Sequence, residues 1–548
     1  MLILRIQILT SALFLLFIST LNGQRAGLKS ITIPELEQHI SFLASDELKG
    51  RDTGDAGLEV AARYIANEAR FTGLDPADED RDYFQEYAIV EKDYDMDNTR
   101  VIITDKDDNT TFLDDEFLVI PRGNNNALLI EGQVVFAGYG INAEEIGYND
   151  FGDIDIEDKM VMIMSRAPMD EEGVNFKLDS DTWDSDHNFR QKMGYIMSKR
   201  PKAVLRVFDP KSGTQSFSDL NPRIAGYMMR SRDLKIQSGS EGEDEGEMRI
   251  IMIHRNIADK ILEEKGETLE SLQMKIDSDL KPHSFLIEDV NVKFELTLKE
   301  EKTVVRNVFG YIEGNDPVLK NEMVIYSAHY DHVGYDDEGN IYNGADDNAS
   351  GTVALLEIAE AFMKERKKPR RSVGFLWVSA EEIGLFGSEY YSEDPLISLE
   401  QTAAVINLDM VARSRTEADS AGSHRSQLTI VGGDTVKVIG GLQSKILMAL
   451  NEKTLDEMGL VGEYKFNDPD HPERYMFRSD HFNFMKKDVP VLFYSTGTHH
   501  DYHMPSDITE NLDFEKFLKM TRFAFKAGYN AADYKGEIEV DNPYSTWE

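Results

Sequence analysis

The sequence predicts an α/β fold, a three-layer αβα sandwich around a mostly parallel, mixed central sheet. The first observation is a set of apolar runs of buried-strand length in the C-terminal half, at 323–330, 372–380, 403–410 and 489–496. The second is that amphipathic helical patterns lie between and after these runs, at 351–366 and 514–529. Strands that alternate with helices form mostly parallel sheets with both faces covered.

The composition narrows the range of functions. The chain has 548 residues, with 59 Lys and Arg against 100 Asp and Glu, so its net charge is −41. This charge excludes a non-specific nucleic-acid-binding protein, which needs a basic face, and it disfavours docking on an anionic membrane. Cysteine is absent, which excludes disulfides, thiolate catalysis and cysteine-ligated zinc. Any metal ion must therefore be held by His, Asp and Glu side chains.

The first 23 residues have the layout of a secretory signal peptide. Arg5 provides a positive charge, an apolar run follows from Ile6 to Leu21, and small residues lie near its end. An uncleaved membrane anchor is the alternative, because the run is nearly long enough to cross a bilayer. We expect cleavage and export to the periplasm or the extracellular space, with no transmembrane span in the mature chain.

Two helical patterns follow within residues 33–72, separated by the Gly-rich, charged loop 46–57. The second pattern, at 57–74, contains Gly73 near its end, where it is a plausible helix C-cap. Residues 84–135 alternate apolar and polar side chains and contain turn-forming stretches, which predicts strands joined by turns.

The pattern changes between residues 131 and 285, where strand-like runs alternate with polar loops. These runs are 133–141, 159–165, 202–208 and 248–254. We interpret this segment as a separate β-rich unit inserted into the α/β fold. The predicted division of the chain is a signal peptide at 1–23, a main domain in two parts at 24–115 and 287–535, the inserted unit at 116–286, and a tail at 536–548.

Acidic and histidine side chains gather where the four apolar runs end. His329 and Asp331 end the first run, and two residues apart on a strand they share a face. The other candidates are Asp346 and Asp347 in the loop 344–351, Glu381 and Glu382 after the second run, Asp409 in the third run, and the stretch 501–503 after the fourth. Ligand chemistry in an α/β sheet is usually placed at the carboxyl ends of strands. Each fragment alone is weak, but their combination indicates a metal site.

Charge counting supports two divalent cations at this edge. The groups available to hold them are His329, Asp347, Glu382, Asp409 and His503. Three of these are carboxylates, which together with one hydroxide balance the four positive charges of two Zn²⁺ ions. Glu381 is then left uncommitted beside the ions, where a general base belongs.

Three motifs together carry a resemblance to a known family. They are GADDNASG at 344–351, AEEIGLFGS at 380–388 and NLDM at 407–410. With them, the sequence resembles the zinc-dependent exopeptidases that have a co-catalytic di-zinc centre. That family includes secreted bacterial aminopeptidases, glutamate carboxypeptidases and, as a non-catalytic relative, the transferrin receptor. The resemblance covers residues 300–530 and the N-terminal stretch ASDELKGRDTG, and VVFAGYGI and EDKMVMIM resemble the protease-associated domain often inserted in these enzymes.

The resemblance implies two Zn²⁺ ions per chain. Its five implied ligands are His329, Asp347, Glu382, Asp409 and His503. Asp347, rather than its neighbour Asp346, is the implied bridging ligand. Cobalt or manganese stays open as the native metal, because a set of two His and three carboxylates favours zinc without excluding them.

The resemblance also assigns roles in catalysis. Glu381 is the implied general acid/base, Asp331 the aspartate behind the ligand His329, and Tyr502 a tyrosine that hydrogen-bonds the developing oxyanion in some members. RSDH at 478–481 matches a stretch near the substrate pocket, where Arg478 or Asp480 would contact substrate. The alternative for RSDH is a helix start capped by Ser479 or Asp480. We expect His499 and His500 to be loop residues or to support the site.

The expected function is that of an exported zinc aminopeptidase, a metallopeptidase that hydrolyses N-terminal residues from peptides or proteins. A glutamate-carboxypeptidase-like enzyme is the main alternative, because the motif region offers Arg413, Arg415, Arg474 and Arg478 for substrate carboxylates. A glutaminyl cyclase ranks lower, as does a non-catalytic binding protein, since all five implied ligands and Glu381 are present. The preferred N-terminal residue, the oligomeric state and the role of the inserted unit do not follow from the sequence.

Overall fold

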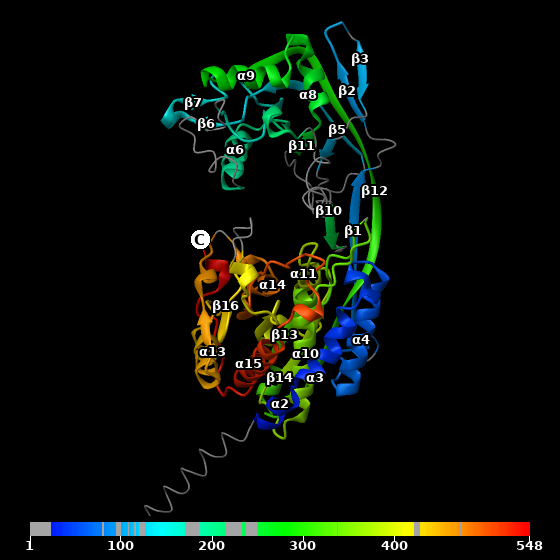
Figure 1. The fold of residues 1–548 in the computed structure, drawn as a ribbon, viewed down its shortest axis with the longest axis vertical. Coiled ribbons are helices and arrows are strands. Elements are labelled where there is room, and N and C mark those ends of the chain that lie inside the picture. The colour runs from blue at the N-terminus through cyan, green and yellow to red at the C-terminus, as the bar shows by residue number, and fades with distance from the viewer. Residues whose placement is uncertain are drawn as a thin grey trace, which may run out of the picture. The chain divides into compact units, whose positions relative to one another are not determined.

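The computed structural model describes residues 24–547, except 79, 81, 95–99, 108, 114–116, 120–126, 170–185, 215–232, 237–248, 337, 421–427 and 472. The chain forms two compact units (Figure 1). The first comprises Met1–Ala88 and Val304–Glu548, and the second comprises Ile89–Thr303. The predicted signal peptide at 1–23 lies outside the described residues. Among the described residues, no helix is both long and apolar enough to cross a membrane.

The first unit is built on a mixed, mostly parallel sheet. Its strand order is β17 (Val461–Glu463), β16 (Thr435–Gly440), β18 (Val491–Ser495), β15 (Thr402–Leu408), β13 (Met323–His329), β14 (Ser372–Val378) and β12 (Phe285–Ile312). The central neighbours β18, β15, β13 and β14 all pair in parallel. The two antiparallel pairings join β16 to β18 and β12 to β14. The predicted α/β fold with a mostly parallel, mixed sheet is therefore confirmed.

Helices cover this sheet on both faces, as two adjacent residues of the central strand β13 show. Tyr326 donates its hydroxyl proton to Ala524 O and stacks on Phe375. The next residue back, Ile325, packs in a different apolar cluster, with Tyr391 and Phe484. Because neighbouring residues on a strand point to opposite faces, the helices that contribute these partners must lie in separate layers.

The layer that packs on Tyr326 contains helices from both ends of the chain. It includes α2 (Arg25–Ser30), α3 (Ile33–Leu43), α4 (Ala56–Thr72), α10 (Gly351–Lys364) and α15 (Phe514–Ala532). Figure 1 shows α3, α10 and α15 side by side. The predicted cap at Gly73 is present, with a φ of 88° that ends α4. Helix α10 is buried along most of its length because other helices pack around it.

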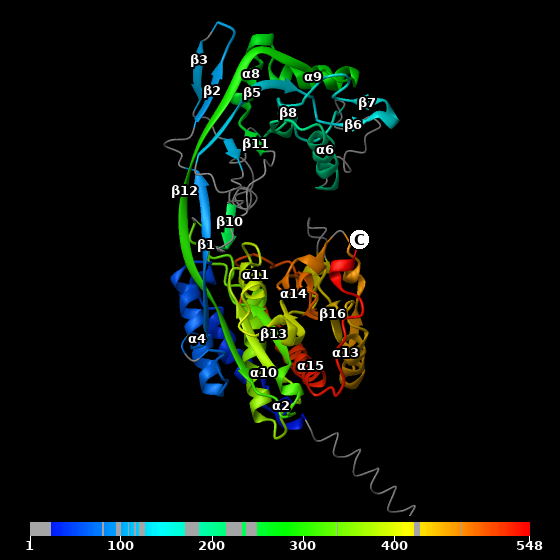
Figure 2. The same ribbon diagram turned by 180° about the vertical axis from the view of Figure 1, so that it is seen from behind.

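The opposite layer contains shorter helices that follow the strands. Helix α11 (Phe386–Glu393) packs against α14 (His481–Lys486), and α14 also contacts β15 and β18 (Figure 2). Helix α13 (Lys445–Met458) begins at Ser444, whose side chain accepts a hydrogen bond from Leu447 N. Unlike α11 and α14, it packs against α15, so it belongs to the layer on the Tyr326 side of the sheet.

The second unit has a mixed sheet of its own. Its parallel core has the order β5 (Ala127–Phe136), β8 (Met160–Met164), β9 (Ala203–Val207) and β11 (Arg249–Ile253). Strand β4 (Phe117–Val119) joins β11, and β12 joins β5, both antiparallel. Among the described residues of this unit, the helices that accompany these strands are α6 (Asp186–Ser198), α8 (Arg255–Leu262) and α9 (Leu269–Asp279). The apolar runs in the sequence predict these four strands, but not their parallel pairing and none of the helices.

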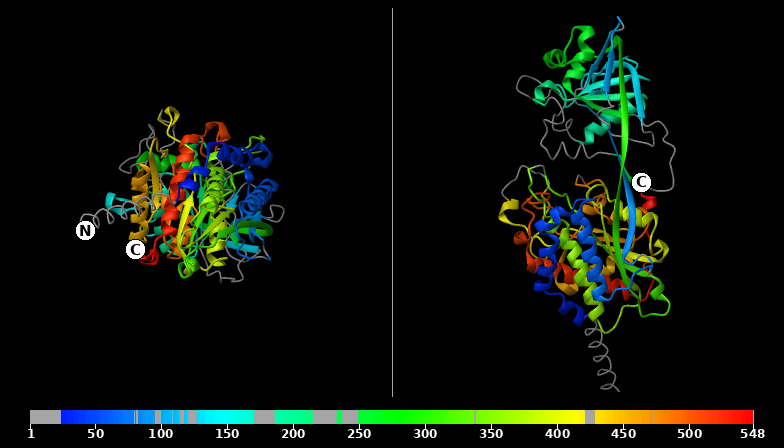
Figure 3. Two further views of the ribbon diagram at one scale, coloured as in Figure 1. Left: turned by 90° about the horizontal axis from the view of Figure 1, so that it is seen from below. Right: turned by 90° about the vertical axis from the view of Figure 1, so that its right-hand side faces the viewer.

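The second unit is wider than the predicted inserted segment 116–286. Strand β2 (Arg100–Thr104) pairs with β12, and β3 (Thr110–Leu113) pairs with β2, so both belong to this unit. Strands β1 (Phe84–Tyr94) and β12 each contribute residues to both units, and β12 is one long strand (Figure 3). Pairing along these strands places the boundaries at Ile89 and Thr303.

Local backbone geometry explains where the predicted strand 133–141 stops. Strand β5 ends at Phe136, because Gly138 and Gly140 follow with φ values of 49° and 71°. The chain there wraps around Asp150, whose carboxylate accepts hydrogen bonds from Tyr139 N at 3.1 Å and Ile141 N at 2.9 Å. A Cβ on Gly138 would lie 2.3 Å from that carboxylate, so only glycine fits the turn.

Candidate metal centre

The parallel strands of the first unit bring the predicted residues to one edge. His329 is the last residue of β13, Glu381 and Glu382 follow β14, and Asp409 follows β15. His503 lies in the loop after β18. These side chains and Asp347 form groups whose nitrogen and oxygen atoms lie within 4.8 Å of one another.

The first group contains His329, Asp347 and Asp409, all buried. His329 Nε2 lies 3.5 Å from Asp347 Oδ1 and 3.6 Å from Asp409 Oδ1. The other oxygen of Asp409 accepts a hydrogen bond from Ser479 Oγ at 2.8 Å. Ser479 in turn accepts from Asn407 Nδ2, so polar side chains behind the strand orient Asp409 with Oδ1 toward His329.

The second group lies on the other side of Asp347. His503 Nε2 is 2.9 Å from Asp347 Oδ2 and 3.0 Å from Glu382 Oε2. A further histidine, His332, joins this group with Nδ1 at 2.8 Å from Glu382 Oε1. The two oxygens of Asp347 thus face two separate groups, which is the arrangement a bridging carboxylate needs.

Asp347 owes its orientation to a short turn of π-helix, Ala345–Ser350, in front of α10. The backbone N–H groups of Asp346 and Asp347 both donate to the Asp507 carboxylate at 3.1 Å. Asn348 ties the turn to the end of β15 by donating to Leu408 O at 2.9 Å. Because these contacts fix the backbone on both sides of Asp347, its carboxylate is held between the two groups.

The neighbouring Asp346 points away from both groups. Its Oδ1 accepts a hydrogen bond from Ala412 N at 2.7 Å, and its Oδ2 lies 3.2 Å from His499 Nε2. His500 is engaged elsewhere, with Nδ1 at 2.8 Å from Asp419 Oδ1. These two histidines therefore do not join the groups around Asp347.

Asp331 is fully buried but is not tightly bound to His329. The closest atoms of its carboxylate and the imidazole, Oδ1 and Nδ1, are 3.7 Å apart, and Nδ1 lies closer to the backbone oxygen of Asp331, at 3.3 Å. The carboxylate instead accepts hydrogen bonds from Glu381 N and Glu382 N, each at 3.1 Å. Asp331 therefore fixes the backbone from which both glutamates project.

Glu381 lies beside the first group, with Oε2 at 4.0 Å from His329 Nε2. Burial raises the pKa of Glu381 well above its usual range, His329 opposes this shift, and the nearby carboxylates of Glu382, Asp480 and Asp409 add to it. A carboxyl group whose pKa is raised by burial is suited to accept and return a proton.

The carboxylates also act on the histidines. Burial alone would lower the pKa of His503, but Glu382 and Asp347 outweigh it and raise that pKa to about 10. The pKa of His329 is likewise raised, because Glu381 and Asp409 outweigh its burial. The site thus concentrates negative charge that positive charge must compensate, and divalent cations held by the same atoms would do so.

The RSDH stretch does not cap a helix with its side chains. Asp480 precedes α14, but its carboxylate makes no capping hydrogen bond, and Ser479 is bonded to Asp409 instead. Asp480 is fully buried, and burial raises its pKa to about 7. Arg478 and Tyr502 lie close together, and Tyr502 stacks on His503 with ring centroids 4.0 Å apart.

The side chains gathered at this site fit zinc. Two imidazoles and three carboxylates are ligands that Zn²⁺ accepts, and all five lie in the two groups that share Asp347. Asp409 Oδ1 is buried and has no hydrogen-bond partner, although it faces the first group. An acceptor of this kind is costly unless a cation satisfies it, so the residues present fit the metal.

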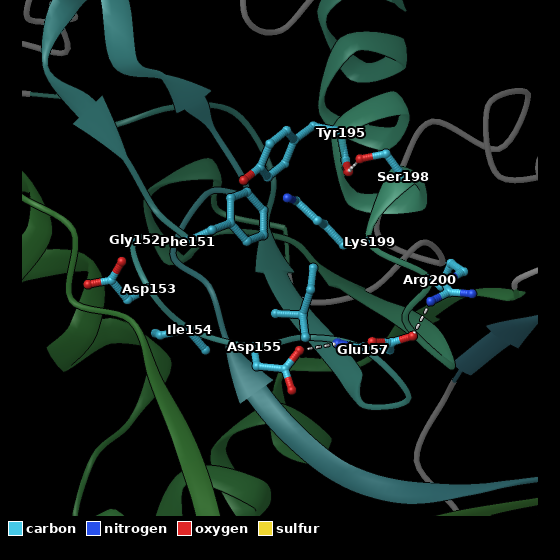
Figure 4. Close-up of a pocket in the computed structure, with 11 residues that line it drawn as sticks. Phe151, Gly152, Asp153, Ile154, Asp155, Glu157, Tyr195, Ser198, Lys199 and Arg200 are labelled. Atoms are coloured by element: carbon cyan, nitrogen blue, oxygen red, sulfur yellow. Dashed lines mark hydrogen bonds and ion pairs between the residues drawn. The ribbon is translucent and has the colours of Figure 1, made fainter.

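The second unit has a pocket of about 350 Å³, lined mainly by the segment 151–157 and by residues 195 and 198–200 (Figure 4). Three of its charged side chains are engaged with neighbouring residues. Arg200 pairs with Glu157, and Lys199 lies over the Tyr195 ring at 5.4 Å. It contains no His/carboxylate cluster of the kind found in the first unit.

Comparison with known proteins matches part of the chain to a described family. Residues 307–527 match the family described as Peptidase family M28. Leucine aminopeptidase 2 of Arthroderma otae is 28% identical over 209 residues, which are 38% of this chain and 37% of that protein. The uncharacterized protein YfbL of Escherichia coli is 27% identical over 219 residues, which are 38% of this chain and 67% of that protein. The chain thus spans little more than a third of the leucine aminopeptidases it matches.

Among solved structures, the aminopeptidase from Aneurinibacillus sp. strain AM-1 has the same fold. It is 17% identical, with a TM-score of 0.52 over 95% of this chain and 98% of that chain. The expected resemblance to the zinc exopeptidase family is confirmed at the level of the family, while the protease-associated domain stays a prediction. The part of the chain that resembles peptidase family M28 is thus 307–527, and the residues of the candidate metal centre lie inside it.

Proposed function

We propose that this protein is a zinc-dependent exopeptidase, an aminopeptidase that removes N-terminal residues from peptides or proteins. One observation carries the proposal. The two oxygens of Asp347 face two separate groups of His and carboxylate ligands, and the uncommitted Glu381 lies beside one of them. The names of the curated relatives support the choice of an aminopeptidase.

We assign His329, Asp347 and Asp409 to one zinc site and Asp347, Glu382 and His503 to the other. Two Zn²⁺ ions held there would lower the pKa of a water molecule and polarise the scissile carbonyl group. The residues themselves contribute rigidity, because Asp507, Ser479 and Asp331 hold the backbone or side chains of the ligands in place.

Glu381 is the proposed general base and acid. Its raised pKa suits it to take a proton from the attacking water and to return it to the leaving amine. Asp331 keeps Glu381 in place by accepting the hydrogen bond from its backbone N–H. Tyr502, next to His503, is the proposed hydrogen-bond donor to the oxyanion, and burial, Asp347 and Glu382 raise its pKa so that the hydroxyl keeps its proton.

The state of three of the four candidate arginines favours an aminopeptidase over a carboxypeptidase. Arg413 is buried and bonds Asp501 at 2.6 Å, and Arg415 donates to Ile430 O at 2.9 Å. Arg474 lies over the Phe477 ring at 4.9 Å. Arginines engaged in this way are poor candidates for binding substrate carboxylates. The acidic site instead suits the cationic α-amino group at the N-terminus of a peptide.

A panel of aminoacyl-nitroanilides, each with a free and an acetylated amino group, tests the proposal. We expect cleavage of the free-amine set only, with loss of activity in a chelator and recovery on adding Zn²⁺. The variant Glu381→Gln should lose about 10²- to 10⁴-fold in kcat while it keeps its zinc. Cleavage of neither set, with cleavage of acetylated dipeptides at the C-terminus, would replace the aminopeptidase by a carboxypeptidase.

We also propose export of the chain through the signal peptide at 1–23, to the periplasm or the extracellular space. The apolar run after Arg5 supports it. Mass spectrometry of the mature protein from the native host should give an N-terminus near residue 24. An intact Met1 on protein in the cytosolic fraction would contradict export.

A further inference from the structure

His332 contacts the candidate metal centre, but no assigned role accounts for it. Its ring is fully buried, and its Nδ1 atom lies 2.8 Å from Glu382 Oε1. The distance to the nearest oxygen of Asp347 is longer, at 3.8 Å. The imidazole is therefore within hydrogen-bond distance of a single carboxylate oxygen, Glu382 Oε1.

The position of the ring is fixed by its surroundings. Gly344 packs against it so closely that a Cβ there would lie 2.4 Å from His332 Cγ, and Gly344 has a φ of 58° that favours glycine. The ring of His503 packs edge-on against it, with centroids 5.3 Å apart and an angle of 79°. The backbone is held too, because His332 N donates to Arg51 O at 3.2 Å.

This position determines how Glu382 presents its oxygens. Oε1 faces His332, while Oε2 lies 3.0 Å from His503 Nε2 on the side of Asp347. At 2.8 Å an imidazole nitrogen next to a carboxylate oxygen must carry a hydrogen, since two lone pairs would repel each other. The Nδ1–H group thus holds Oε1 and leaves Oε2 for a cation.

We propose that His332 is a positioning residue that makes Glu382 a single-oxygen ligand of the second zinc site. It does so by donating Nδ1–H to Oε1, without contacting the metal itself. The inference rests on the proposed function, because it takes from there the assignment of Glu382 as a zinc ligand. It concerns one of the two sites only, since His332 makes no contact with the His329 and Asp409 side of the centre.

Two substitutions separate this role from a simple packing role. His332→Leu fills the space with an apolar side chain of moderate size but removes the Nδ1–H donor. His332→Asn is the matched control, because its amide nitrogen occupies nearly the place of Nδ1 and can donate to Oε1. Calorimetric titration of the metal-free full-length proteins with Zn²⁺, and the visible spectrum of the Co²⁺-loaded proteins, give readouts independent of activity.

We expect His332→Leu to weaken one of the two zinc sites by about 10- to 100-fold and to leave the other unchanged. His332→Asn should bind within about threefold of the wild type and keep its Co²⁺ spectrum. Equal binding by the Leu variant would overturn the inference. An altered Co²⁺ spectrum in both variants would also overturn it, because His332 would then be a ligand itself.

The same titration separates this inference from the proposed function. A wild type that binds two zinc ions but cleaves no peptide would refute the aminopeptidase and leave the comparison of His332 variants valid. A wild type that binds fewer than two zinc ions would overturn both. Circular dichroism of each variant shows whether the fold is retained.

Discussion

Glu357 makes the stability of the first unit depend on pH. It lies on α10 with its side chain only 2% exposed, and its Oε1 is 3.5 Å from His39 Nε2 on α3. Burial raises the pKa of Glu357 to about 8, and the charges of Glu35 and Glu360 add to the shift. Burial also lowers the pKa of His39. Both side chains are therefore neutral at pH 7, and the glutamic acid carries its proton.

The direction of the effect follows from proton binding. In the unfolded chain Glu357 has an ordinary pKa near 4.5, so the folded state binds this proton more tightly. The stabilisation is complete below pH 4.5 and is lost as the pH rises through 8. Between pH 5 and pH 8 the free energy of unfolding falls by about 1.4 kcal/mol per pH unit, which is on the order of 4 kcal/mol in total.

The assay compares wild type with Glu357→Gln, which mimics the protonated acid at every pH. Urea unfolding of the chelator-treated proteins at several pH values removes the separate pH dependence of metal binding. Fluorescence of Trp377 reports on the right region, because its indole donates to Thr352 O at the start of α10. Both proteins carry Trp183→Phe and Trp547→Phe, so that Trp377 is the remaining tryptophan of the three.

We expect the two proteins to have similar stability at pH 5 and the Gln variant to be more stable by on the order of 4 kcal/mol at pH 8. Glu360→Gln is the matched control, since Glu360 lies on the same helix, is 31% exposed and pairs with Lys364. It should change the pH dependence only slightly, because Glu360 adds less to the pKa shift of Glu357 than burial does. A constant gap between wild type and Glu357→Gln from pH 5 to pH 8 would refute the reasoning.

Three further predictions concern buried polar groups and close packing. Arg51→Met should lower the stability of the first unit by on the order of 4 kcal/mol and weaken zinc retention. The reason is that the buried guanidinium donates to Tyr330 O, Asn343 O and Gly344 O in the loops beside the metal centre. Thermal unfolding and metal analysis check this, and an unchanged zinc content would contradict it. Asp150→Ala should destabilise the second unit by about 3 kcal/mol, because two backbone N–H groups and the Tyr148 hydroxyl lose their acceptor. Hydrogen exchange should show faster opening of the second unit alone. Equal protection of this unit in the variant and the wild type would count against the prediction. Gly57→Ala should lower the free energy of unfolding by more than about 2 kcal/mol, because the new Cβ would lie 1.9 Å from Leu48 O. Gly194→Ala on α6 is the control, because the space around Gly194 is open. It should be neutral or stabilising in the same denaturation assay.

The fold and most of the site residues could be predicted because their signals are local. Each buried strand is a continuous apolar run, and His329, Glu381 and Asp409 come directly at or after such runs. Parallel pairing then brings the carboxyl ends of neighbouring strands together without further information. The predicted bridging role of Asp347 rests on the family resemblance instead, because the loop 344–351 offers Asp346 and Asp347 side by side.

The contacts of His332 and Asp331 could not be predicted from local pattern. The loop that contains both residues is held by Arg51 and Gly50, which donate or accept hydrogen bonds across more than 270 residues of sequence. Nothing in the sequence near His332 indicates that its ring packs on Gly344 or that Nδ1 reaches Glu382. Long-range contacts of this kind appear only once the whole fold is assembled.

The second unit was predicted less well, although part of its signal was present. Helix α8 buries Ile257, Ala258, Ile261 and Leu262, which have the spacing of an amphipathic helix. That pattern follows a strand directly and is short, so a strand with a polar loop was the simpler interpretation. The limits of the unit depend on pairing between β2 and β12, about 190 residues apart, which no local pattern reveals.

The most direct test of the central claim is anomalous diffraction at the zinc edge from crystals of the zinc-loaded protein. We predict two peaks about 3.5–4 Å apart. Asp347 should lie between them, with His329 and Asp409 on one and with Glu382 and His503 on the other. A single peak, or a pair that does not share Asp347, would contradict the account.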